Sequence, residues 1–122
     1  MASWTLLAQQ AATAAAGFAL QNATPTIISW TAPSDGNLHR VQIFASMSVG
    51  SAETGGTVSY KGTNPDGSTF VHTLFTGGNA GPGEVQPSAQ LRIVKAGTTV
   101  SIVQTSALTS GAATVWAEIW GS

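Results

Sequence analysis

The chain of 122 residues contains no cysteine. This absence excludes disulfide bonds, thiol catalysis and metal sites built on thiolates. It leaves the cellular compartment open, although small secreted domains often use disulfides to compensate for a small core. The length is typical of one domain.

Charged residues are also scarce: four basic and five acidic side chains make up 7% of the sequence, and the formal net charge is −1. An average globular domain has roughly 25% charged residues. Because there is no basic stripe to neutralise phosphates, nucleic-acid binding is excluded as a main function. So few charges leave two explanations, a surface of small polar residues or a surface that is largely buried in an assembly.

Targeting and membrane signals are missing as well. The first 21 residues contain no basic side chain, and their alanine-rich stretch is broken by Gln9, Gln10 and Thr13, so we expect no secretory signal. No run reaches the ~18 strongly apolar residues of a membrane span. Without a secretory route, the Asn-Ala-Thr sequon at residues 22–24 is interpreted as a chance match.

Motifs for catalysis are not found: the sequence has no nucleophile elbow, phosphate-binding loop, paired acidic motif or zinc signature. Asp35, His39 and His72 give one hint of a metal or acid–base site, but two histidines without cysteine make no spacing motif. We interpret Asp35 as a turn residue and the histidines as surface or hydrogen-bonded polar positions. We therefore predict no enzyme activity, no metal and no cofactor.

The apolar pattern divides the chain at Gly17. Before it, residues 3–16 predict either a short helix capped by Ser3 or an N-terminal arm that becomes ordered on docking. After it, the apolar period falls to two, which is typical of β-strands. We expect an N-terminal segment over residues 1–17 and a β-domain over residues 18–122.

About eight strands are predicted in that domain, separated by turns rich in glycine, proline, asparagine and aspartate. An Asn-Pro-Asp-Gly turn at residues 64–67 predicts a hairpin over residues 57–75, and residues 76–88 are expected to form the longest loop. The predicted strands cover residues 18–21, 26–31, 38–49, 57–61, 68–75, 89–94, 98–105 and 113–120. Such a pattern indicates an antiparallel β-sandwich or barrel.

Three of these strands are apolar, or nearly so, on both faces: residues 26–30, 41–49 and 115–120. In a small sandwich one face of each strand normally meets water and is polar. A second apolar face needs cover, and another copy of the chain is the simplest source of it.

The last strand places Trp116, Glu118 and Trp120 on one face. Three interpretations are open: a core with Glu118 at its margin, a subunit interface in which Arg40 or Arg92 pairs with the carboxylate, or a glycan platform. The residues that we predict for a subunit interface are Arg40, Trp116, Glu118 and Trp120.

Two stretches carry a resemblance to known proteins. A strand leading into Ala-Pro-Ser-Asp-Gly at residues 32–36, followed by Leu-His-Arg-Val at residues 38–41, resembles the first half of small bacteriophage virion proteins. The stretch Leu-Arg-Ile-Val-Lys-Ala-Gly-Thr-Thr-Val-Ser-Ile at residues 91–102 resembles the late strands of jelly-roll domains. The whole, over roughly residues 18–121, resembles the trimeric tumour-necrosis-factor-like jelly rolls, phage capsid decoration proteins and some fibre tips.

The resemblance implies an all-β antiparallel jelly-roll sandwich with a structural role in a virion. We expect a capsid decoration (cement) protein that binds the outer capsid surface as a homotrimer and stabilises it, with further copies of itself and the major capsid protein as partners, and no nucleic acid or membrane. Trp4, Leu7 and Phe18 are the residues expected to dock on the shell. The alternatives are a tail-fibre tip or adhesin that binds a host glycan through exposed tryptophans and residues 76–88, and a tail or baseplate component of the same fold.

Overall fold

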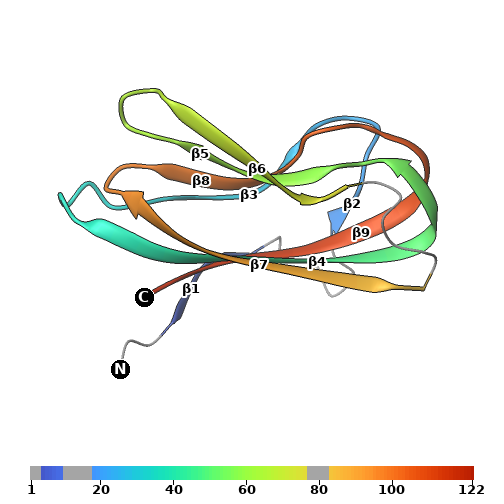
Figure 1. Cartoon of the computed structure of the whole chain (residues 1–122), viewed down its shortest axis with the longest axis horizontal. Helices are drawn as coiled ribbons and strands as arrows, with labels where there is room; N and C mark the ends of the chain where they lie inside the picture. Colours follow the sequence, from blue (N-terminus) through green and yellow to red (C-terminus); the bar gives the residue numbers. More distant parts are fainter. Residues whose placement is uncertain (1–3, 10–17, 77–82) are drawn as a thin grey trace.

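The computed structural model describes residues 4–9, 18–76 and 83–122 of the chain. Within these ranges the protein has no helix, and its strands form two antiparallel sheets that lie one over the other (Figure 1). Sheet A contains β1 (Thr5–Gln9), β2 (Phe18–Ala19), β4 (Leu38–Gly55), β7 (Val85–Lys95) and β9 (Leu108–Gly121). Sheet B contains β3 (Thr26–Thr31), β5 (Val58–Thr63), β6 (Thr69–Phe75) and β8 (Thr99–Gln104). The predicted antiparallel β-sandwich is confirmed.

The chain crosses between the two sheets several times. Sheet A has the order β1-β9-β4-β7, with β2 also paired to β9, and sheet B has the order β3-β8-β5-β6. The antiparallel pairs are nested, because β2 pairs with β9, β3 with β8, β4 with β7 and β5 with β6. The chain therefore has the pairing of one long hairpin whose two arms are rolled into a sandwich.

The core lies between the sheets and follows from alternation along each strand. In β4, every second residue from Val41 to Val49 is at most 2% exposed, and β9 contributes the fully buried Val115, Ala117 and Ile119. Sheet B contributes Ile28, Val58, Tyr60, Phe75, Val100 and Ile102. Burial of each large apolar side chain stabilises the fold by roughly 1.5–3 kcal/mol.

The predicted hairpin is confirmed between β5 and β6. The N–H of Gly67 donates to the carbonyl of Asn64 at 2.9 Å, and Gly67 has a φ of 87°, which residues with a side chain rarely adopt. Gly97, in the turn before β8, has a φ of 79°, and a Cβ there would lie 2.9 Å from Cγ of Pro65. These two turns therefore lie against each other at one end of the sandwich.

The N-terminal segment differs from the prediction of a helix. Residues Thr5–Gln9 form a strand that pairs with β9, with Thr5 opposite Gly121 and Gln9 opposite Glu118. The helical alternative is wrong for these residues, because long-range pairing outweighs the helix propensity of leucine and alanine. The rest of the predicted helix, residue 3 and residues 10–16, is outside the described ranges. Since β1 is an edge strand of sheet A, its residues are part of the sandwich itself.

Three strands are longer than predicted. β4 extends to Gly55, β9 begins at Leu108, and β7 begins at Val85 inside the stretch that was predicted as a loop. The loop prediction, based on the prolines and glycines of residues 76–88, is wrong for residues 85–88. Pro87 is accommodated because β7 is at the edge of sheet A, where a strand has a free side that needs no N–H. Residues 77–82 of the predicted loop are outside the described ranges.

Candidate functional site

The two sheets present different faces to the outside. On sheet B the outward side chains are mostly serine and threonine, and they bond to one another across the strands. The Thr31 and Thr99 hydroxyls are 2.8 Å apart, and the Ser101 hydroxyl donates to that of Ser29 at 3.2 Å. This is the polar, solvated face expected of one side of an antiparallel sandwich.

The side of sheet A that is turned away from sheet B is called outer face A. Its members follow from the register, since residues opposite each other in a ladder point to the same side and alternate with the buried residues. They are Leu6 and Gln9 in β1; Ala19 in β2; Leu38, Arg40, Gln42, Phe44, Ser46 and Ser48 in β4; Val85, Pro87, Ala89, Leu91, Ile93 and Lys95 in β7; and Thr114, Trp116, Glu118 and Trp120 in β9, with Trp4 beside Arg40.

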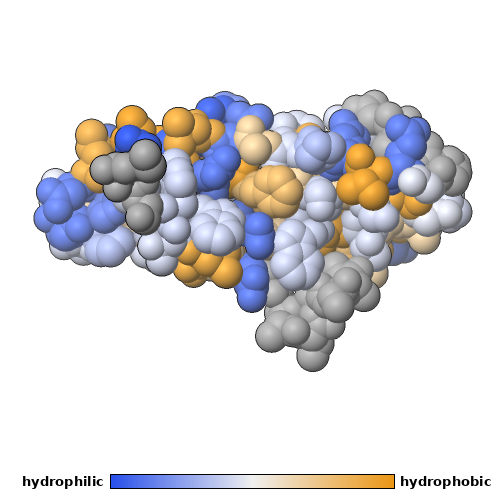
Figure 2. Space-filling model, turned by 90° about the horizontal axis from the view of Figure 1, so that it is seen from below, coloured by the Kyte–Doolittle hydropathy of each residue, from blue (hydrophilic) through white to orange (hydrophobic). Residues whose placement is uncertain are grey.

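Exposed apolar side chains gather on outer face A. Of the seven large hydrophobic residues exposed in the described part of the chain, six belong to this face and only Val71 lies on sheet B. Leu38 is 70% exposed, Val85 and Ile93 are each 63% exposed, and Leu91 is 56% exposed. Figure 2 looks onto the sheet A side of the molecule, where hydrophobic atoms show at several places among paler and hydrophilic ones. Outer face A is therefore the candidate interaction surface of this sandwich.

Strand β7 shows the feature most directly, because its amphipathic pattern is inverted. Its apolar residues, the odd-numbered ones from Val85 to Ile93, point outward and are exposed. Its polar residues, Gln86, Ser88, Gln90 and Arg92, point toward sheet B and are half-buried. The apolar side of a strand normally determines which face is covered. Sequence reasoning missed this stripe, although the alternation over residues 85–93 was visible in the printed chain.

Trp116, Glu118 and Trp120 share outer face A, as predicted. All three are half-buried, and Nε1 of Trp120 donates to Oε1 of Glu118 at 3.2 Å. The interpretation that the tryptophans fill the core is wrong, because the opposite side of β9, with Ala117 and Ile119, faces the core. The interface and glycan interpretations both keep these indoles on the outside.

The two arginines considered as partners of Glu118 have different positions. Arg92 points inward, where its Nε donates to the hydroxyl of Tyr60 at 2.5 Å and its guanidinium lies over the tyrosine ring. Arg40 belongs to outer face A, and its guanidinium carbon is 5.6 Å from the ring centroid of Trp4. Arg92 is therefore committed to the inside, and Arg40 remains on the same face as Glu118.

The three residues predicted to dock on a shell are not gathered into one patch. Trp4 lies beside Arg40 on outer face A, whereas Phe18 is half-buried in β2 opposite Val115. Leu7 packs against the core, and its Cδ1 is 2.6 Å from where a Cβ on Gly121 would be. Leu7 is therefore a packing residue of its own sandwich, and of the three only Trp4 belongs to the exposed face.

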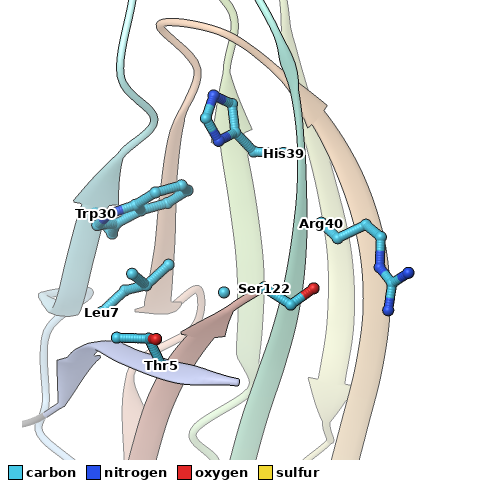
Figure 3. A pocket seen from close by; sticks show the side chains of 7 residues that line it. Thr5, Leu7, Trp30, His39, Arg40 and Ser122 are labelled. Atoms are coloured by element: carbon cyan, nitrogen blue, oxygen red, sulfur yellow. The ribbon is translucent and has the colours of Figure 1, made fainter. Parts of the chain in front are cut away.

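A pocket of about 320 Å³ opens at one end of the sandwich, lined by Thr5, Leu7, Trp30, His39, Arg40, Gly121 and Ser122. Figure 3 shows Trp30, Leu7 and Thr5 on one side of it and the Arg40 guanidinium directed away from them. The His39 ring packs edge-on to that of Trp30, with centroids 6.2 Å apart. The lining therefore offers apolar and aromatic contacts beside one imidazole.

Of the three residues considered for a metal or acid–base site, Asp35 and His39 are in contact, whereas His72 lies elsewhere. Nε2 of His39 is 2.9 Å from Oδ1 of Asp35, and the pKa of Asp35 is lowered by the hydrogen bond from the N–H of Asn37 and then by His39. His72 lies on β6, where its ring is 5.1 Å from that of Tyr60. In the described part of the chain no three histidine, aspartate or glutamate side chains come close enough to hold a metal.

Comparison with known proteins gives no relative: no protein-family model matches the chain, and no curated protein is significantly similar in sequence. Among the described residues there is no helix of the length and hydrophobicity required to cross a membrane.

Proposed function

We propose that this protein is a structural virion component, a capsid decoration protein that binds the outer head shell as a homotrimer and stabilises it. The observation that carries the proposal is the inverted pattern of β7, whose exposed side holds Val85, Leu91 and Ile93. Removal of apolar surface from water contributes roughly 25 cal/mol per Å². A second copy on outer face A would bury this apolar stripe, which is exposed in the single chain.

The nested strand pairing supports a jelly roll as the fold of the subunit. A jelly roll has eight antiparallel strands in two packed sheets. Counting β1 and β2 together as one interrupted strand beside β9, the chain has eight strands, four to a sheet. This arrangement agrees with the resemblance to jelly-roll virion proteins over residues 18–121.

The proposed mechanism is purely physical. Subunits would associate through outer face A, and the assembled protein would attach to several capsomers at once. Linked weak contacts hold far more tightly than one contact, because each additional contact forms at high effective concentration. Trp4, next to Arg40 at the rim of the face, is the candidate for a contact to the shell.

Native mass spectrometry and light scattering test the assembly. We expect a species of three times the 12.3 kDa chain mass. Replacement of the exposed pair Leu91→Thr and Ile93→Thr should shift it toward the monomer, whereas Val71→Thr on sheet B, 52% exposed, should leave the assembly unchanged. A monomer at all concentrations would overturn the proposed trimer. Binding of the intact protein to undecorated heads of the phage that encodes it then tests the capsid role.

A glycan-binding tip or adhesin is the second candidate, favoured by the row Trp116, Glu118 and Trp120 on the outward side of one strand. Indole rings stack on sugar rings, and a carboxylate accepts hydroxyl hydrogen bonds. This alternative predicts quenching of tryptophan fluorescence by host-surface glycans with the chain remaining a monomer. The trimer proposal predicts that assembly, and not added sugar, changes the environment of these indoles.

A further inference from the structure

On outer face A the opposite charges of Arg40 and Glu118 form no ion pair with each other or with another described residue of the same copy. The ion pair between His39 and Asp35 involves neither of them. Glu118 accepts a hydrogen bond from Trp120, and Arg40 has the ring of Trp4 under its guanidinium. Both groups are thus held in position by an aromatic neighbour but not neutralised.

These two charges do not meet inside one subunit. Glu118 is opposite Phe44 in the ladder between β9 and β4, so Arg40 is four residues further along β4. At 3.3–3.4 Å per residue this separation is about 13 Å. Arg92, the other arginine near the face, is directed toward Tyr60 on the inside. Lys95, opposite Leu38 at the end of β7, also belongs to outer face A. The pKa of Asp66 is lowered mainly by the hydrogen bonds from Ser68, and Lys95 adds to this effect.

Covering the apolar face would bury both charges, and a buried unpaired charge costs several kcal/mol. A neutral apolar partner would leave both unpaired. A second copy of the chain brings an acidic group for Arg40 and a basic group for Glu118 on the same face. The complementarity of the face therefore favours another copy as its occupant.

We propose that Arg40 of each subunit forms an ion pair with Glu118 of the next subunit across outer face A. In a closed ring every copy uses its Arg40 on one neighbour and its Glu118 on the other, so both of these charges are paired. Trp4 and Trp120 orient the two side chains before association. This inference rests on the proposed assembly and specifies its polar contact.

Charge reversal tests the pair on the intact chain. Arg40→Glu places two acidic groups at the contact and Glu118→Arg places two basic groups there, so each single variant should dissociate at least about tenfold more readily than the original protein. The double variant, with both charges exchanged, should assemble again. Lys61→Glu, on the exposed side of sheet B, is the matched control. It reverses one charge as Arg40→Glu does, but away from outer face A, and this variant should assemble normally.

The outcomes separate the inference from the proposed function. An original protein that assembles while both single variants assemble equally well would overturn the pair and leave the trimer intact. A double variant as weak as the single ones would also overturn it. An original protein that stays monomeric would overturn the proposed assembly itself. Circular dichroism of each variant verifies the fold, and the neutral variants Arg40→Gln and Glu118→Gln, expected to weaken association less, replace any reversal that unfolds.

Discussion

Gly62 shows how a single missing side chain creates space for another. In β5 it lies opposite Phe70 of β6, and a Cβ at residue 62 would be 1.9 Å from Cζ of that ring. The ring of Phe70 is 6.4 Å from that of Tyr60 and 6.1 Å from that of His72, measured between centroids. The glycine therefore allows an aromatic cluster to form over the backbone of a strand.

We expect Gly62→Ala to destabilise the fold by about 1–3 kcal/mol, because the Phe70 ring must move out of its cluster. Urea unfolding of the two proteins measures the difference. Gly50→Ala is the control, since a Cβ there would make an ordinary contact of 3.7 Å with the carbonyl oxygen of Ala112. That variant should be neutral or more stable by about 0.5–1 kcal/mol, and equal losses in both variants would contradict the steric explanation.

Asp35 gives a prediction for acid conditions. The N–H of Asn37 donates to its carboxylate at 3.0 Å, and with His39 this lowers the pKa of Asp35 below 3.8. A carboxyl whose pKa is lower in the folded state stabilises the fold above pH 3.8 and loses that contribution as the pH falls through the folded-state pKa. We expect Asp35→Asn to flatten the fall in Tm below about pH 4. Parallel Tm curves for the two proteins from neutral to acidic pH would exclude this contribution.

At the scale of elements, Gln104 at the end of β8 holds three segments together. The side chain is 1% exposed; its Oε1 accepts from the N–H of Gln21 at 2.9 Å, and its Nε2 donates to the carbonyls of Gln21 at 2.6 Å and Ser106 at 3.0 Å. The amide thus connects the segment between β2 and β3 to the turn between β8 and β9. Its buried polar atoms are satisfied, as a sandwich edge requires.

We expect Gln104→Leu, which removes these bonds, to cost about 1–3 kcal/mol, because the N–H of Gln21 and the carbonyl of Ser106 lose this partner. The carbonyl of Gln21 still accepts from the N–H of Leu108 at 2.9 Å. The loss should appear as a lower urea midpoint with the same m-value. Ser101→Ala, which removes an exposed hydroxyl bond on sheet B, is expected to change the midpoint little. A midpoint for Gln104→Leu within the error of the original protein would show that the amide bonds do not stabilise the fold.

Several elements were predictable because their own residues decide them. The alternation of β4 from Val41 to Val49 and the glycine turn at residues 64–67 each carry a local signal, and both are found as predicted. β1 was not predictable, since four of its five residues, Leu6 to Gln9, have helix-forming side chains and become a strand only beside β9. Which side of β7 faces outward is likewise determined by its ladder with β4, and this ladder places the polar residues of β7 inside.

The shared face of Trp116, Glu118 and Trp120 followed from the period of a strand alone. What the sequence did not reveal is the rest of outer face A, because Leu6, Leu38 and Leu91 come from three strands that only the fold brings together. The two arginines could not be distinguished for the same reason. A period of two assigns residues to the faces of one strand, but the neighbouring ladder decides which of those faces is the outside.

At the scale of the whole molecule, an assembly through outer face A makes thermal stability depend on concentration. Dissociation accompanies unfolding, so mass action raises Tm as the protein becomes more concentrated. We expect Tm to increase over a hundredfold range of concentration, and the Leu91→Thr, Ile93→Thr variant to show a smaller increase. Differential scanning calorimetry measures both, and a Tm independent of concentration in the original protein would argue for a monomer.

The position of β9 has a consequence for how the protein is made. It is the last strand of the chain, yet in sheet A it lies between β4 on one side and β1 and β2 on the other. Sheet A therefore stays open, with β1 and β2 lacking their partner, until residues 108–121 have left the ribosome. Sheet A is completed through contacts between distant parts of the chain, which makes folding slow. During that interval the edge of β4 and the apolar stripe of β7 are both open to aggregation.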